Sequence, residues 1–522
     1  MKQIKTNKNF FNPIIASSLA FLLSGSLYGQ GSITTNCGTN NNCNSITGDV
    51  VIKWGDTSNN ANFETSTSDN TTTIIFNKSG TGDSTSTGKI DTVNFKDSAF
   101  MDKKIFTDNG NHTMTVTLDS GKTFNLLAEN TIFNANLVIN DTSSSSTPKF
   151  TGTFKHGMTG NINIGADKNL SNANTTLTFG DTPTNEANTQ NSPKELKGNI
   201  TIYAADASNN TITFKEDFKT QKISTIQGKS AITFEKNATI QSSGEAISTG
   251  TWEKKGVAEA TFTFKGTTNL IKNTGNPQGI AIRAHTNSGP NKNAKNILKF
   301  EGDNSTNTIE GAILAIANLN HDRKGINEIT FSEKTATNTI KGSIAAKVSS
   351  VSENNIIFKG KTSNTIIGSI TANDGINKIS MIPTSGSNTI AGIITATADS
   401  YGNQGINYLY FSGEKTTIGN NEITDETKAI TTSIIANKKD KSTTDIHNFL
   451  KLESKTNEIN LKDLSALAEG ETNRDKARNV ISLESTKSMM SEGGNTTPNT
   501  LRIVNITSTG GRNYIGKNIL TS

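Results

Sequence analysis

The sequence predicts an all-β protein built as a parallel β-helix (β-solenoid) with coils of about 20–31 residues. Two short phrases recur at a nearly constant mutual offset, and each alternates apolar and polar residues. Of the 522 residues, 32% are hydrophobic and 19% are charged, so Asn, Thr, Ser and Gly fill much of the chain. This composition suits a fold that buries little per residue, in a chain too long for one compact core.

The repeat consists of two phrases. The first begins with Asn and ends with Phe or Met, at residues 296–300, 327–331, 354–358, 377–381 and 407–411. The second, such as "NTIKGSI", begins at Asn307, Asn338, Asn364 and Asn388. The offsets between the phrases are 11, 11, 10 and 11 residues, whereas the full periods are 31, 27, 23 and 30. The distance between the two phrases is nearly constant, whereas the rest of each period varies in length. This predicts one structural unit that carries loops of different length.

The alternation assigns the repeat positions to places in a coil. We expect one interior column of Ile340, Ile366 and Ile390, and another of Phe300, Phe331, Phe358, Met381 and Phe411. Asn tolerates left-handed backbone and its amide can bond an adjacent turn, so coil corners are predicted for Asn307, Asn327, Asn338, Asn364 and Asn388. Stacked Asn side chains would also bond coil to coil. Bends or close backbone approaches are predicted at Gly311, Gly342, Gly368 and Gly392.

Less regular copies extend the predicted solenoid over residues 45–450, and the repeats are clearest over 294–411. The upstream copies end at Phe76, Phe95, Phe179, Phe214, Phe234 and Phe264. Residues 451–522 are interpreted as terminal strands, with a short helix expected within 462–470. The repeats contain neither long runs of helical spacing nor the strands of a propeller blade, which disfavours both of those architectures.

Residues 1–29 have the order of a secretory signal peptide. Three lysines precede an apolar stretch, and small residues follow it, with cleavage after Ser26 or after Gly29 compatible with the pattern. The apolar stretch is shorter than the about 20 residues that a membrane-spanning helix needs. The sequence therefore predicts export.

Residues 30–44 are predicted to form an N-terminal loop that contains both cysteines of the chain. Cys37 and Cys43 stand close together, and no further Cys or His lies nearby to complete a metal site. In an exported protein such a pair predicts a small disulfide loop, with two free thiols as the alternative.

The sequence predicts no enzyme, no metal, no cofactor and no small-molecule substrate. Carboxylates fall in variable stretches and do not recur at a matched register, as the site of a polysaccharide-cleaving β-helix would require. The five histidines are far apart in the sequence. The net charge of +5 is spread without a basic cluster, which disfavours nucleic-acid binding.

Behind the signal peptide, the paired phrases "GIN-x-I-x-F" and "NTI-x-G-x-I" resemble the repeats of vacuolating-cytotoxin-like (VacA-like) autotransporter passenger domains. The resemblance is clearest over residues 294–411 and looser over the rest of the mature chain. It implies a secreted, right-handed parallel β-helix, which the family delivers through a C-terminal outer-membrane β-barrel. The C-terminal part, which ends "GRNYIGKNILTS", contains no series of amphipathic strands long enough for a barrel. We therefore expect a truncated passenger without the translocator barrel. The long apolar, glycine-spaced segment used by the toxin for its pore is also missing.

These expectations converge on an adhesin-like or colonisation factor that works by surface contact with host cell molecules. Its predicted location is the bacterial surface or the medium, if a barrel encoded elsewhere exports it, and otherwise the periplasm. Two alternatives stay open at this point. One is a vacuolating-type toxin that acts on host membranes, and the other is a β-helix polysaccharide lyase or glycosidase.

Overall fold

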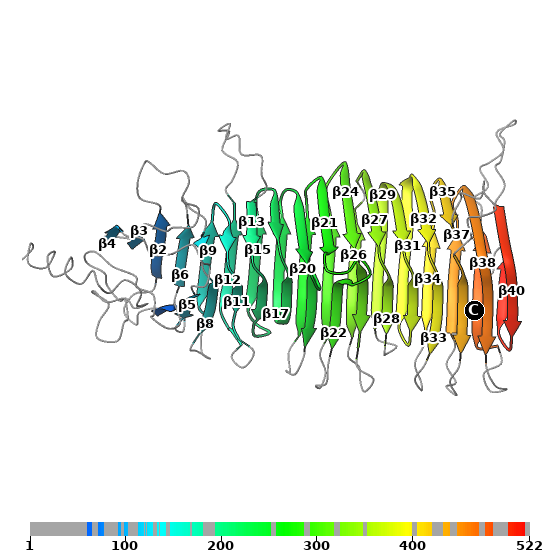
Figure 1. Cartoon of the computed structure of the whole chain (residues 1–522), viewed down its shortest axis with the longest axis horizontal. Helices are drawn as coiled ribbons and strands as arrows, with labels where there is room; N and C mark the ends of the chain where they lie inside the picture. The colour runs from blue at the N-terminus through cyan, green and yellow to red at the C-terminus, as the bar shows by residue number, and fades with distance from the viewer. Residues whose placement is uncertain are drawn as a thin grey trace, which may run out of the picture.

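The computed structural model is an elongated rod of stacked coils (Figure 1). It describes the backbone of four strands between residues 60 and 102 and most of residues 113–516. Within the latter range the gaps are residues 119–120, 122, 129–132, 135, 142–146, 167–169, 181–193, 252–256, 287–292, 318–323, 333, 348–351, 399–404, 420–431, 439–445, 469–474 and 484–499. The predicted signal peptide (1–29) and the Cys37–Cys43 loop lie outside the described residues.

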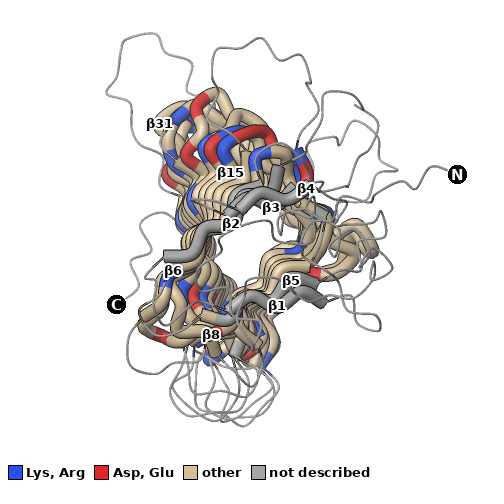
Figure 2. The backbone as a smooth tube through the Cα atoms, turned by 90° about the vertical axis from the view of Figure 1, so that its left-hand side faces the viewer, with Lys and Arg blue, Asp and Glu red and all other residues tan. Residues whose placement is uncertain are grey.

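Each coil has three sides, which we call faces 1, 2 and 3. In the coil that starts at residue 325, β26 (Gly325–Phe331) forms face 1, β27 (Ala336–Lys341) face 2 and β28 (Ile344–Lys347) face 3. Each strand pairs in parallel with its counterparts in the preceding and following coils. Seen along the rod, the coils lie behind one another with a common outline (Figure 2).

The remaining strands repeat this arrangement. Face 1 also contains β2 (Thr71–Asn77), β6 (Thr123–Ala128), β9 (Lys149–Phe154), β12 (Asn174–Phe179), β15 (Asn209–Phe214), β20 (Ala258–Phe264), β23 (Ala294–Phe300), β31 (Ile376–Ser385), β34 (Ile406–Phe411), β37 (Ile446–Leu452), β39 (Ala477–Leu483) and β41 (Arg512–Gly516). Face 2 also contains β7 (Phe133–Asn134), β10 (Met158–Thr159), β13 (Lys194–Lys197), β16 (Phe218–Thr220), β18 (Ala238–Ser242), β21 (Thr268–Asn273), β24 (Ser305–Glu310), β32 (Ser387–Ala391) and β35 (Lys415–Ile418). Face 3 also contains β1 (Asn60–Glu64), β5 (Thr113–Leu118), β8 (Asn136–Asp141), β11 (Ile162–Ile164), β14 (Ile200–Tyr203), β19 (Ile247–Thr251), β22 (Ile280–Thr286), β25 (Ala312–Ile316), β30 (Ile370–Asn373), β33 (Ile394–Ala398) and β36 (Ile434–Lys438).

Four longer strands run over a corner and serve two faces each. They are β17 (Ile223–Phe234), β29 (Glu353–Ile367), β38 (Thr456–Ala468) and β40 (Thr500–Thr509). Among the described residues, every strand pairing is parallel except those of β3 (Thr92–Phe95), which pairs antiparallel with β2 and with β4 (Ala99–Asp102). The phrase that ends at Phe95 is therefore not a coil strand, contrary to the prediction.

The all-β parallel solenoid predicted from the repeat is confirmed, and so are its two interior columns. On face 1, eight phenylalanines stack with ring centroids 4.5–5.3 Å apart, namely Phe154, Phe179, Phe214, Phe234, Phe264, Phe300, Phe331 and Phe358. Met381 and Phe411 continue this column in register. On face 2, Ile340, Ile366 and Ile390 occupy one register position and are fully buried. Coil-on-coil burial of these side chains is the main stabilising term of the fold.

Two ladders of asparagine side chains run beside the apolar columns. In the face 1 ladder each Nδ2 lies 2.7–2.9 Å from the next Oδ1, along Asn296, Asn327, Asn354, Asn377, Asn407, Asn448, Asn479 and Asn513. The face 2 ladder has spacings of 2.8–3.0 Å along Asn269, Asn307, Asn338, Asn364 and Asn388. The predicted coil-to-coil bonding of stacked amides is thus confirmed.

The predicted corner position of these asparagines is wrong. Asn307, Asn327, Asn338, Asn364 and Asn388 lie inside strands, and their side chains are at most 1% exposed. Left-handed backbone is used by other residues, because the described non-glycine residues with positive φ are Asn304, Asp374 and Asp475. The amides point inward and some reach the backbone of a neighbouring strand, as Asn354 Nδ2 does with the Ala345 carbonyl at 2.8 Å.

The predicted bends at Gly311, Gly342, Gly368 and Gly392 are confirmed between faces 2 and 3. Their φ angles lie between 121° and 156°, where L side chains are rarely found. The four glycines also stack on one another. A Cβ on Gly368 would come within 2.3 Å of the Gly342 carbonyl oxygen, so the backbones of adjacent coils approach too closely for any side chain.

Two further expectations need correction. Residues 462–468 belong to strand β38, so the predicted short helix is wrong; its alternating burial is that of a strand. Several coils are longer than the predicted 31 residues, since stacked partners are separated by as few as 20 residues (Asp217 and Asn237) and as many as 53 (Asn60 and Thr113). The stack also continues beyond residue 450, because β39 pairs with β37 and β41 pairs with β39.

Candidate functional site

The sequence-predicted repeat positions belong to the scaffold. The asparagines and Phe331 face the interior, where each is hydrogen-bonded or stacked to the equivalent residue of the next coil. The glycines form the bends. Groups engaged in this way are not available to an external ligand, so a functional site has to be sought on the outer surface or at irregular bends.

An irregular part of the described surface lies at the bends between faces 2 and 3. Two residues form this bend at 198–199 and at 221–222. The next two bends are longer, at residues 243–246 and 274–279, and the one after them is Gly311 alone. Two long bends next to two short ones interrupt the even outline of the stack and leave a groove over the short bends.

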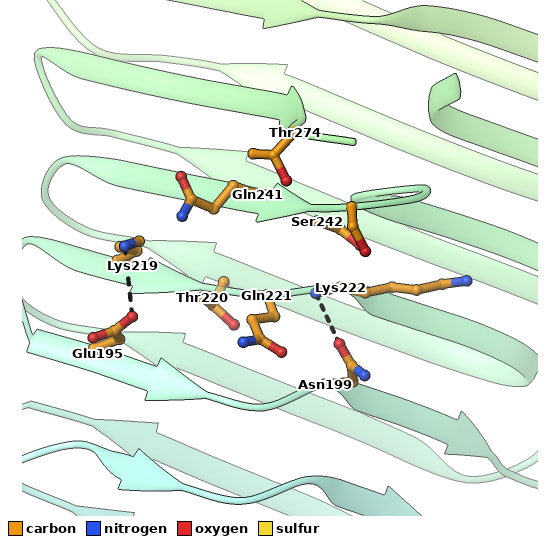
Figure 3. Close-up of a pocket in the computed structure, with 10 residues that line it drawn as sticks. Glu195, Asn199, Lys219, Thr220, Gln221, Lys222, Gln241, Ser242 and Thr274 are labelled. Atoms are coloured by element: carbon orange, nitrogen blue, oxygen red, sulfur yellow. Dashed lines mark hydrogen bonds and ion pairs between the residues drawn. The ribbon is translucent and has the colours of Figure 1, made fainter. Parts of the chain in front are cut away.

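This groove, called the bend groove below, has a volume of about 350 Å³ and a largely polar lining (Figure 3). It is lined by Glu195, Asn199, Lys219, Thr220, Gln221, Lys222, Gln241, Ser242, Ser243 and Thr274. The lining residues come from four successive coils, so the groove runs along the rod. Thr220 lies at its floor in register with the core residues Leu196 and Ile240, and its buried Oγ1 has no hydrogen-bond partner among the described residues.

Hydrogen bonds hold both sides of the bend groove. On the side of the short bends, the Asn199 Oδ1 accepts from the Lys222 backbone N–H at 3.2 Å. On the opposite side, the Asn273 Oδ1 accepts from the backbone N–H groups of Gly275 and Asn276, both at 3.0 Å. The Asn273 amide also donates to the Ile280 carbonyl at 3.0 Å, so one buried side chain closes the six-residue bend.

A cluster of charges lies at the rim of the bend groove. Glu245 accepts from the Lys222 Nζ and from the Arg283 guanidinium, each at 2.9 Å. Next to it, burial lowers the pKa of His285, the positive charge of Arg283 lowers it further, and Glu245 opposes both effects. His285 is therefore held in its neutral form at neutral pH, and the network carries its net positive charge on Lys222 and Arg283.

The outer side of face 1 carries a stacked aromatic pair, the exposed Tyr408 and the partly buried Phe449. Their rings stack at 5.6 Å with 20° between the planes, and Tyr408 is 42% exposed. Each ring therefore covers one face of the other.

A second open groove of about 490 Å³ lies at the turns between faces 1 and 2, where hydroxyl-bearing residues such as Thr306, Thr337 and Ser363 repeat from coil to coil. It follows the regular repeat, and Lys361 is the charged residue in its lining. Within the described residues there is no cluster of three or more His, Cys, Asp or Glu side chains that could bind a metal. That part of the chain also contains no helix with the length and apolarity needed to cross a membrane.

Comparison with protein families, with characterised proteins and with solved structures gives no match to this chain. The assignment of a site therefore depends on the geometry above. Sequence reasoning missed the bend groove because it followed the repeated positions. The available signal was the inserted stretch "TGNPQG" (274–279), which separates two strand-like phrases by six residues, whereas the equivalent bends at 198–199, 221–222 and Gly311 have one or two.

Glu310, on the outer side of face 2, allows a pH-dependent prediction. Its carboxylate lies 2.7 Å from the Lys272 Nζ and 3.4 Å from the Lys341 Nζ. The hydrogen bond from Lys272 lowers the pKa of Glu310, Lys341 adds to this, and partial burial opposes it. Since the folded pKa lies below the unfolded value of about 4.3, the stabilisation is present above that value and is lost as pH falls through the folded pKa.

We expect Glu310→Gln to lower the free energy of unfolding at pH 7 by about 0.5 kcal/mol or less, because solvent screens this half-exposed pair. The difference from the wild type should shrink to zero in increasingly acid buffer, which thermal unfolding over a pH series would measure. A difference that persists at acid pH would show that the carboxylate acts through packing instead of charge.

Proposed function

We propose that this chain is an exported β-helical passenger of the vacuolating-cytotoxin-like type, which acts as an adhesin-like factor by contact with host cell surface molecules. The observation that carries the proposal is the contrast, within each coil, between regular strands and variable connecting segments. The strands pair in a constant register apart from shifts in three pairings, whereas the segments that join face 3 to the next face 1 differ in length and sequence from coil to coil. These include residues 252–257 between β19 and β20, 348–352 between β28 and β29, and 399–405 between β33 and β34.

A repetitive scaffold of this kind presents an extended surface, and binding residues are commonly carried on connections held by a rigid frame. The two asparagine ladders and the phenylalanine column give such a frame along the described rod. An interior occupied by identical contacts in successive coils supports a display role.

The test is binding of the purified full-length chain to cultured epithelial cells, with dye release from liposomes and reducing-sugar release from polygalacturonate measured in parallel. Saturable cell binding without dye or sugar release is the expected result. Dye release from liposomes would favour the membrane-active toxin, and sugar release would favour the polysaccharide-cleaving enzyme. Absence of cell binding would contradict the adhesin-like function.

A further inference from the structure

We propose that the bend groove is a binding site for a carboxylate-bearing oligosaccharide. The inference rests on the proposed function as a surface-contact protein, and it names a ligand class and a place on the rod for that contact.

The bend groove offers hydrogen-bonding groups that the protein does not itself use. The side-chain amides of Gln221 and Gln241 line it and form no hydrogen bond with any described residue (Figure 3). Each amide has two N–H donors and one carbonyl acceptor, which is the combination that adjacent sugar hydroxyls can satisfy from both sides. The hydroxyls of Ser243 and Thr274 add groups that both donate and accept.

The charges around the bend groove select an acidic ligand. Lys197, Lys219, Lys222 and Arg283 face two carboxylates, Glu195 and Glu245. Cations thus outnumber carboxylates by two in this neighbourhood. Lys219 is the cation best placed for a ligand, because it belongs to the lining, its Nζ lies a loose 3.6 Å from Glu195 and its side chain is 39% exposed.

The mixture of groups favours a sugar acid over a phosphate. Glu195 lies within the lining, where it would repel a dianion but would accept hydrogen bonds from sugar hydroxyls. A single carboxylate on an otherwise hydroxylated ligand can bind Lys219 while its hydroxyls contact Gln221, Gln241 and Glu195. The volume of about 350 Å³ lies within the usual range of small-molecule sites.

The walls of the bend groove are held by contacts within the chain itself. Asn273 closes the bend at 274–279 through three hydrogen bonds, and Glu245 joins its own bend to Lys222 and Arg283. A preformed site loses less conformational entropy on binding than a flexible loop does. This order sets the bend groove apart from a chance indentation between mobile side chains.

The test uses the full-length chain and fluorescently labelled hyaluronan tetrasaccharide and trigalacturonate, with N-acetylchitotetraose as the neutral comparison. Fluorescence polarisation should show saturable binding of at least one acidic oligosaccharide and weaker binding of the neutral one. Lys219→Glu, and separately the double variant Gln221→Ala with Gln241→Ala, should each weaken acidic binding about tenfold or more, the effect of losing about 1.4 kcal/mol of contact.

The matched control is Lys378→Glu on the outer side of face 1. Lys378 is also a partly exposed lysine paired with a glutamate, Glu353, at 2.9 Å, but it lies away from the bend groove. This variant should bind the acidic oligosaccharides within about twofold of the wild type. All variants alter surface side chains, so their thermal unfolding should match the wild type and separate loss of binding from loss of fold.

Failure of both acidic oligosaccharides to bind would overturn the inference, and so would equal losses in the bend groove and control variants. Cell binding, measured separately, tests the proposed function. Groove variants that lose the oligosaccharide but still bind cells would place the host contact elsewhere on the rod. A wild-type chain that binds the oligosaccharide but no cells would contradict the adhesin-like function and leave the groove assignment standing.

Discussion

Replacing Phe331 by alanine is expected to lower the stability of the surrounding coils by about 3–5 kcal/mol, the usual cost of truncating a buried phenylalanine. Phe331 is fully buried, and its ring stacks on Phe300 at 4.6 Å and on Phe358 at 4.5 Å. The truncation removes both stacking contacts and leaves a cavity. The neighbouring rings cannot close this cavity, because their strands are fixed in register on both sides.

Native-state hydrogen exchange is the suitable measurement for Phe331→Ala, because the stability of a stacked repeat is a sum of local coil and interface terms. Protection should fall most in β23, β26 and β29 and should recover with distance along the rod. Thr330→Ala, which alters the outward-facing neighbour in the same strand, should change stability by less than about 0.5 kcal/mol. Equal effects of the two substitutions would contradict the interior column.

Asn354→Ala is expected to destabilise the chain by about 2–5 kcal/mol, although it removes few apolar contacts. Asn354 accepts a hydrogen bond from Asn327 at 2.9 Å and donates to Asn377 and to the Ala345 carbonyl, both at 2.8 Å. All three amides are fully buried. Truncation therefore leaves a buried donor on one neighbour and buried acceptors on the others, and none of them can reach water.

The control for Asn354→Ala is Asn355→Ala, the next residue in β29, whose side chain takes the outward position. Denaturant unfolding should place this control within about 0.5 kcal/mol of the wild type. A small effect at Asn354 would indicate that water enters the ladder or that the remaining amides re-pair across the gap. Either outcome would show that the ladder fixes the register between coils but adds little to the stability of the fold.

The fold could be predicted from the sequence to a large extent because the chain repeats itself. Alternation placed Phe331 and Ile340 inside, and the near-constant offset of the two phrases fixed how faces 1 and 2 follow one another. The corner position predicted for Asn338 failed for a physical reason. A buried Asn338 amide bonds to an identical amide in the coil on either side, and these contacts outweigh the local preference of asparagine for turns.

The bend groove could not be predicted in the same way. Its lining residues, such as Gln221 and Gln241, stand at positions that do not repeat, and their proximity depends on how four coils with unequal bends stack. The helix expected within 462–470 failed similarly, because "KDLSALA" has helix-forming residues but continues β38 across a corner. In both cases tertiary stacking outweighed the local preference of the segment.

The asparagine ladders also make each coil interchangeable with its neighbours. Asn327, Asn354 and Asn377 present the same donor and acceptor to the coil above and to the coil below. Loss of one complete period, such as residues 327–353, would therefore bring Asn354 against Asn296 with every inward position still matched. Duplication of a period would be accommodated equally well, whereas a partial period would break both ladders. Such chains can gain or lose whole coils during evolution. The length of the rod can therefore change while the packing of the core is kept.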